Sequence, residues 1–325
     1  MAESWLAFPG PDSFILSFPR PEVKFHTFEL TITMKHFLFG IQYLVTYWFL
    51  KEKKPLICGL VMHNACNLNC LHCRITERPA ESLGFEESKH LIDSFYREGG
   101  RTIYFEGGEP FLWHDREYEL EDVVNYARKK GFLATIIYTN GTYPIKTSAD
   151  TVFISLDGLK KTNDLIRGTT FDRILQNIAE SNHPSLYINF TINNYNKDEI
   201  FDFCDFINGV KQIRGVFFYF HSPYYGYDDL YIADKEKGEI LTRLIEHKQK
   251  YKILNSVAGL KSSRRNDWKR PLNICRIYEG GKNYLCCRFP DNIELCKNCG
   301  YLSYAEIDQV LKFKPSAILN AIKYF

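Results

Sequence analysis

The sequence predicts an α/β protein: a partial, TIM-like (β/α)6 barrel, preceded by an apolar helix and followed by a small cysteine-rich domain. Two patterns predict the barrel. Between residues 55 and 222, short apolar runs alternate with stretches of helical length, and polar turn residues follow several of the runs. The chain has 325 residues, 45% hydrophobic and 25% charged, which is ordinary for a folded protein. A net charge of +2 gives no reason to expect a nucleic-acid partner.

The N-terminal part divides at Met34. Residues 1–33 are rich in Phe and Pro without a sustained period, which predicts a poorly ordered extension or a mis-assigned start. Residues 34–54 predict an apolar or amphipathic helix, closed by Lys51, Lys53 and Lys54. Three interpretations stay open: a helix lying at a membrane surface, a helix packed on the protein's own core, and a membrane span, for which the apolar run is short. No small-residue cleavage site follows, so a signal peptide is not expected.

The barrel region, residues 55–222, contains six predicted strands with helices between them. The strands are expected at 57–63, 102–105, 133–138, 152–155, 186–192 and 215–220. The helices are expected at 86–98, 119–130, 171–181 and 197–208, and another at 234–250. Because the carboxyl ends of parallel barrel strands meet at one mouth, we expect the chemistry there.

The alternation fades after this region, and residues 223–325 are predicted to form an appended domain with two small helices at 304–313 and 315–323. Most of the ten cysteines lie in two clusters, which favours metal ligands in a reducing compartment, the cytoplasm, with possible membrane association. Cys58 and Cys204 lie outside the clusters and are expected in the core.

The first cluster is the run CNLNCLHC, in which Cys66, Cys70 and Cys73 follow an apolar strand. Three thiolates on one loop can hold three irons of a 4Fe–4S cluster and leave the fourth without a protein ligand. The amino and carboxylate groups of S-adenosylmethionine (SAM) can chelate that iron and receive an electron, which releases a 5′-deoxyadenosyl radical. Structural zinc is the alternative, but zinc usually takes four protein ligands.

This CxxxCxxC loop, followed by GGEP after the next strand, resembles the radical SAM superfamily. The resemblance implies that Gly107, Gly108, Glu109 and Pro110 receive the amino group of SAM, with the glycines allowing close backbone approach. It further implies SAM contacts from polar residues after later strands and a position near the adenine for one histidine. These candidates are Asn140 in TNG, Ser155 and Asp157 in SLDG, Asn193 in TINN, and His72.

The second cluster lies in the tail and contains Cys275, Cys286, Cys287, Cys296 and Cys299. It resembles the SPASM or twitch tails of radical SAM enzymes, which implies one auxiliary 4Fe–4S cluster. A four-thiolate zinc knuckle would suit the same ligands, and the sequence does not decide which of the adjacent pair is a ligand.

The substrate is less defined. The apolar helix, the cluster loop and the CxxCGY tail are loosely similar to the hopanoid adenosyltransferase branch, which implies a lipid-like substrate; a peptide substrate is equally open. The radical would abstract hydrogen or add to the substrate, with flavodoxin or ferredoxin as electron donor. The aromatic segment 219–231 lines the mouth or packs between domains, and Tyr219, His221 and Tyr225 are catalytic candidates. The alternative is a non-catalytic iron–sulfur or zinc-binding interaction protein with the same fold.

Overall fold

The computed structural model describes residues 34–51, 54–78, 81–224, 226–270, 272–287 and 292–324. The expectations for residues 1–33 and for Tyr225 therefore lie outside the described residues. Within them, one sheet has the strand order β10-β9-β1-β2-β5-β6-β7-β8. Neighbouring strands are parallel from β9 to β8, and β10 is antiparallel to β9. The strands β1 to β8 of this order form the predicted partial barrel.

The strands and helices agree closely with the predicted ones. The sheet consists of β1 (Ile57–Val61), β2 (Thr102–Glu106), β5 (Ala134–Thr139), β6 (Thr151–Ser155), β7 (Leu186–Ile192), β8 (Ile213–Phe220), β9 (Cys275–Glu279) and β10 (Lys282–Leu285). The barrel helices are α2 (Phe85–Glu98), α3 (Leu120–Lys130), α4 (Lys160–Arg167), α5 (Phe171–Glu180) and α6 (Ile200–Gly209). The remaining helices are α1 (Met34–Phe49), α7 (Asp234–His247), α8 (Val257–Arg265), α9 (Ile293–Lys297), α10 (Leu302–Leu311) and α11 (Pro315–Tyr324). A two-stranded hairpin, β3 (His114–Asp115) and β4 (Tyr118–Glu119), precedes α3.

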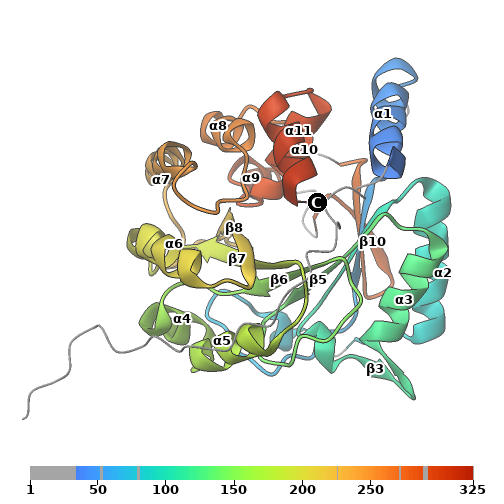
Figure 1. Ribbon diagram of the computed structural model, residues 1–325, viewed down its shortest axis with the longest axis horizontal. Helices are drawn as coiled ribbons and strands as arrows, with labels where there is room; N and C mark the ends of the chain where they lie inside the picture. The colour runs from blue at the N-terminus through green and yellow to red at the C-terminus, as the bar shows by residue number, and fades with distance from the viewer. Residues whose placement is uncertain are drawn as a thin grey trace, which may run out of the picture.

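Successive side chains along the barrel strands point to opposite faces of the sheet, so that one face packs in the hydrophobic core and the other faces the inside of the barrel. Leu60, Ile103 and Phe105 are fully buried in a hydrophobic cluster with the inner faces of α2 and α3, which cover one side of the sheet in Figure 1. The residues between them, such as Tyr104, point to the opposite face. Gly59 pairs with Tyr104 across the strands, and a Cβ there would lie 2.2 Å from the Tyr104 ring. The glycine thus makes room for a large ring inside the barrel.

The tail continues the barrel sheet. Strand β9 pairs in parallel with β1, so that Cys275 lies opposite Ile57. At the other edge, the Phe220 amide donates to the Gly300 carbonyl at 3.0 Å, and the Gly300 amide donates to Ser222 Oγ at 3.1 Å. The tail therefore contacts both β1 and the end of β8, and it spans the open side of the partial barrel.

Helix α1 has 16 residues and lies at the edge of the molecule (Figure 1). Its Trp48 indole donates to the Leu311 carbonyl of α10 at 2.6 Å. Within the described part of the chain, no helix is long and apolar enough to cross a membrane.

We predict that Gly300→Ala lowers the free energy of unfolding by about 2 kcal/mol, because overpacking a tight contact is destabilising. A Cβ at Gly300 would lie 2.0 Å from the Phe220 carbonyl oxygen. The matched control is Gly238→Ala on α7, where a Cβ meets nothing within 4 Å; there alanine should stabilise the helix by about 1 kcal/mol. Urea unfolding of both variants measures the difference, and equal stabilities would contradict the proposed docking of the tail on β8.

Candidate active site

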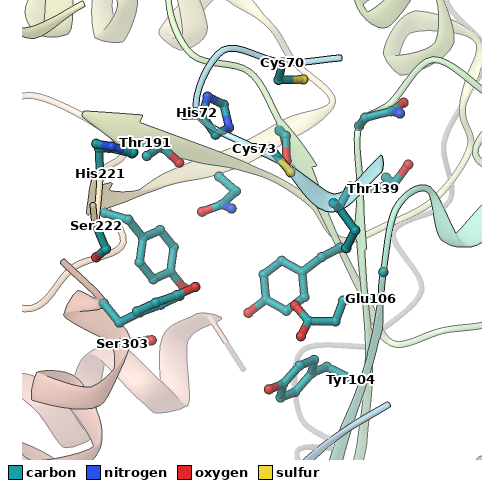
Figure 2. A pocket seen from close by; sticks show the side chains of 18 of the residues that line it. Cys70, His72, Cys73, Tyr104, Glu106, Thr139, Thr191, His221, Ser222 and Ser303 are labelled. Atoms are coloured by element: carbon teal, nitrogen blue, oxygen red, sulfur yellow. The ribbon is translucent and has the colours of Figure 1, made fainter. Parts of the chain in front are cut away.

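A cavity of about 350 Å³ lies where the predicted barrel mouth meets the tail (Figure 2). The cluster loop after β1 provides one part of its wall, and the ends of β2, β5, β6, β7 and β8 provide another. The tail completes it with Cys275 of β9 and with Tyr301, Ser303, Tyr304 and Ile307 at α10. The fold thus brings together both cysteine regions and the strand ends around one space.

The three cysteines of the first cluster all line this cavity. The Cys66 Sγ accepts from the Leu68 amide at 3.4 Å and lies 3.8 Å from Asn140 Nδ2. Arg167 Nη1 lies 4.0 Å from the Cys70 Sγ. Burial raises the pKa of Cys66 and raises that of Cys70 to about 11, although the Arg167 charge opposes the latter shift. A bound metal would take these thiols as thiolates.

The donor set suits a cluster better than a single ion. Among residues with described positions, no three His, Cys, Asp or Glu side chains gather closely enough to hold one metal ion. A four-iron cluster separates its cysteine ligands more widely than one ion does, and three thiols around one cavity fit that arrangement. The cavity wall also contains buried polar atoms without hydrogen-bond partners, Asn189 Oδ1 and His72 Nδ1. Such atoms suit a polar cofactor beside the cluster.

The GGEP segment contacts the beginning of the cluster loop. The Gly108 amide donates to the His63 carbonyl at 2.8 Å, and the Glu109 amide donates to the Ala65 carbonyl at 3.0 Å. A Cβ on Gly107 or Gly108 would lie 2.4 Å from His63 O or 1.9 Å from Ala65 O. The glycines, which also line the cavity, are therefore needed for the packing of two backbones as well as for any cofactor contact.

Glu109 lies behind the cavity wall rather than in it. Its carboxylate is fully buried and accepts from Thr139 Oγ1 and the Asn140 amide, both at 2.7 Å, and from the Phe111 amide at 3.1 Å. Burial raises its pKa while these donors oppose the shift. Neither Glu109 nor Pro110 is among the lining residues, and their contact with SAM stays a prediction. The carboxylate connects the turns after β2 and β5.

Asp157 also lies behind the cavity wall, where it forms an ion pair with Arg167. Nothing in the sequence indicates that Arg167 belongs to the site. Asp157 Oδ2 accepts from Arg167 Nε at 2.6 Å, and Asp157 Oδ1 accepts from the Thr191 amide at 2.7 Å. Both side chains are buried, with 0% and 7% exposure. Arg167 lines the cavity at the end of α4. Asp157 thus orients a cation toward Cys70, and a direct SAM contact from Asp157 stays a prediction.

Of the other residues predicted to contact the cofactor, three line the cavity and one lies behind its wall. Asn140, Ser155 and His72 line it; His72 Nδ1 lies 3.9 Å from Asp157 Oδ2. Asn193 is fully buried and is not among the lining residues; its side chain accepts from the Tyr195 amide at 2.9 Å and donates to the Thr191 carbonyl. It stabilises the turn after β7, while Thr191 faces the cavity.

Two catalytic candidates from the aromatic segment line the cavity, Tyr219 and His221. The His221 Nε2 lies 3.0 Å from Asp228 Oδ2, and the imidazole is buried. Burial raises the pKa of Tyr219 to about 12, so its phenol stays protonated at neutral pH. Six of the tyrosines with described positions line the cavity: Tyr104, Tyr138, Tyr219, Tyr224, Tyr301 and Tyr304. Tyr219 is the one of the six that the sequence predicts as a site residue, although the alternation on β2 is a signal for Tyr104 and Glu106.

The tail cysteines form a second group beside the cavity. Cys275, Cys286, Cys287 and Cys299 pack in one buried cluster with Trp268 and Tyr304. The Cys286 thiol hydrogen bonds with Cys287, and its backbone adopts a φ of 74°, which residues other than glycine rarely take. Burial raises the pKa of Cys299 to about 11. Among the residues with described positions, no three of these thiols lie close enough together to hold a single metal ion, and a second metal centre here, iron–sulfur or zinc, stays a prediction.

Comparison with known proteins agrees with this geometry. A family model described as the radical SAM superfamily matches residues 60–207. The chain is 34% identical over 186 residues to Fe-coproporphyrin III synthase of Methanosarcina barkeri, covering 53% of this chain and 45% of that protein. It is 31% identical over 163 residues to the AdoMet-dependent heme synthase of the same organism, covering 45% of each. The chain thus spans about half the length of these curated relatives.

The fold is also found in a solved structure. SuiB of Streptococcus suis, bound to S-adenosylmethionine, superposes with a TM-score of 0.58 at 16% identity, covering 74% of this chain and 62% of SuiB. The partial barrel and its cysteine loop thus define a radical SAM fold with a C-terminal cysteine region. Residues 60–207 thus match the radical SAM domain, the domain of a superfamily whose enzymes use a 4Fe–4S cluster and SAM.

We predict that Asp157→Asn lowers the free energy of unfolding by about 3 kcal/mol, because it leaves the buried Arg167 without its counter-charge. The matched control is Asp172→Asn, which removes an ion pair with Lys160 whose carboxylate side is 75% exposed; that loss should be about 0.5 kcal/mol or less. Chemical denaturation of both variants gives the comparison, and similar small losses would contradict the role of Asp157 as the buried partner.

Proposed function

We propose that this chain is a radical SAM enzyme that acts on a neutral substrate, lipid-like or peptide, in the tyrosine-lined cavity. The observation that carries the proposal is the shared cavity: Cys66, Cys70 and Cys73 line the same space as the strand-end polar groups and the tail tyrosines. A 4Fe–4S cluster bound there would supply the electron that cleaves SAM to a 5′-deoxyadenosyl radical.

Residues of this chain would bind SAM and hold the cluster loop in position. Gly107 and Gly108 would hold the backbone against the cluster loop, and Asn140 would fix that loop through its 2.9 Å hydrogen bond to Asn67 Oδ1. Ser155, at the end of β6, and Asn189, opposite it in the middle of β7, would offer polar atoms to the cofactor. The geometry supports SAM between the cluster loop and the strand ends, with the substrate toward the tail.

The charged side chains that line the cavity favour a substrate that does not carry several carboxylate groups. Arg167 is the only arginine or lysine among the described lining residues, and it is paired with Asp157. Phenols and the Glu106 carboxylate make up much of the opposite wall. A polyanion would lose water there without gaining cationic partners. This argues against carrying the tetrapyrrole named for Fe-coproporphyrin III synthase over to this chain.

His221 is suited to exchange a proton with the substrate. Asp228 accepts from one ring nitrogen and holds the orientation of the imidazole toward the cavity. Tyr219, protonated and 9% exposed, would act as a neutral hydrogen-bond donor beside it. The electron donor would be a flavodoxin or ferredoxin, and the tail cysteines would hold the auxiliary centre.

We predict that replacing Cys66, Cys70 and Cys73 together with Ala removes about four irons from the anaerobically reconstituted protein, because these thiols hold one 4Fe–4S cluster. Iron, sulfide and zinc are counted, and 5′-deoxyadenosine is measured after dithionite and SAM. About eight irons in the wild type falling to about four would indicate an auxiliary iron–sulfur cluster. Four irons plus zinc would make the tail centre structural.

The matched control for this variant is Cys58→Ala, since Cys58 is fully buried in the core next to α2 and α3. It should keep its iron and its SAM cleavage. A triple variant that keeps the wild-type iron content would contradict the assignment of the three ligands, and would favour a non-catalytic metal-binding protein.

We also predict that coproporphyrin III does not bind saturably to the SAM-loaded protein at micromolar concentration, because the described lining residues include no cation besides Arg167, which is paired with Asp157. Absorbance titration of the porphyrin band is the measurement. Saturable binding that Tyr219→Ala weakens and the exposed Leu165→Ser does not would contradict the proposed substrate class.

A further inference from the structure

Helix α1 carries large apolar side chains on its solvent side as well as on its less exposed side. Its solvent side consists of Leu38, Ile41, Val45, Trp48 and Phe49, which are 45% to 79% exposed. At 100° per residue these five positions span about 100° of the helix circumference, so they form one stripe. Large apolar side chains gathered on one exposed face are unusual, whereas single exposed ones are common.

The side of α1 that faces the protein contains the hydroxyl-bearing rings. Tyr43 donates to the Lys54 carbonyl at 2.7 Å and stacks near Tyr47, with ring centroids 6.5 Å apart. Phe39 lies 6.0 Å from Tyr43 and has the Arg101 guanidinium 5.9 Å from its ring. These contacts fix the rotation of the helix, so the hydrocarbon stripe is held outward.

The apolar surface continues beyond the helix. Leu50 is 65% exposed directly after it, and Phe313, 51% exposed, lies with its ring centroid 6.4 Å from that of Trp48. The Trp48 indole N–H donates to the Leu311 carbonyl, and nearly half of the Trp48 side chain is exposed. We call the set Leu38, Ile41, Val45, Trp48, Phe49, Leu50 and Phe313 the apolar face. Figure 1 shows α1 at the periphery, beyond α10 and α11.

The charges beside this face are mostly positive. Residues 34–54 contain four lysines and one glutamate. Lys51 and Lys54 are exposed just after the helix, and Lys314 is exposed next to Phe313. Apolar side chains bordered by lysines, with a tryptophan at the edge, are typical of helices that lie in the headgroup region of a bilayer. A second copy of the chain packed on this face would bring the same lysines together, which is unfavourable.

We propose that the apolar face docks on the surface of a bilayer that contains anionic lipids, with α1 lying in the plane of the interface. Its 16 residues are too few to span the bilayer, and the outward hydrocarbons would enter the acyl boundary while the lysines contact lipid phosphates. The tail, which lines the cavity, would then lie next to the membrane. This proposal does not depend on the reaction at the cavity.

The experiment is co-sedimentation of the full chain with vesicles of phosphatidylcholine, alone or mixed with phosphatidylglycerol. We expect binding to the mixed vesicles. Leu38→Ser/Ile41→Ser/Val45→Ser should weaken that binding at least about tenfold, with an unchanged melting temperature because these side chains are exposed. The matched control is Leu165→Ser/Ile293→Ser, which removes exposed apolar side chains, 57% and 70% exposed, from other helices and should bind normally. Lys51→Glu/Lys54→Glu should weaken binding to the mixed vesicles more than to phosphatidylcholine.

Three outcomes would overturn the proposal. The first is no wild-type binding to either vesicle. The second is undiminished binding by the triple variant. The third is a wild-type dimer in solution that the triple variant converts to a monomer, since a second copy would then occupy the face. Iron content, measured in parallel, separates these outcomes from failure of the radical SAM assignment.

Discussion

Two backbones lie in direct contact where GGEP packs on the cluster loop, and the rest of the site depends on this contact. Gly107 and Gly108 approach the carbonyls of His63 and Ala65 so closely that neither position has room for a Cβ. The same segment carries Glu109, whose buried carboxylate holds the turn containing Asn140. Asn140 in turn hydrogen bonds Asn67 between the first two cysteines. The position of the cysteines is thus set by a continuous chain of contacts from β2 through β5.

A second chain of contacts determines the electrostatics near the cysteines. Asp157, at the end of β6, accepts from the backbone of Thr191 after β7 and from the Arg167 side chain on α4. The buried ion pair therefore ties two strand ends to a helix and directs a cation toward Cys70. Glu109 and Asp157, two of the predicted cofactor contacts, lie one layer behind the wall and hold residues that line it, an arrangement that is common at sites that must hold their geometry.

The barrel could be predicted because each element carries its own local signal. The six predicted strands are all present, and the helix boundaries at 86–98 and 171–181 differ from the structure by one residue at most. Helix α4 was not predicted, since KKTNDLIR has few apolar residues and is stabilised by contacts such as Asp157 with Arg167. Equally, nothing local shows that β9 pairs with β1, because Ile57 and Cys275 are distant in sequence. The three cysteines that line the cavity could be named as candidate ligands from their spacing, whereas the tyrosine wall depends on which strand faces meet inside the barrel.

The pairing of β9 with β1 also has a consequence for biosynthesis. Strand β1 is complete on both sides only after β9 has been made, so a nascent chain emerging from the ribosome exposes one edge of β1 during most of translation. Exposed parallel edges are templates for aggregation. A chain cut before residue 275 would therefore keep this edge of β1 permanently uncovered.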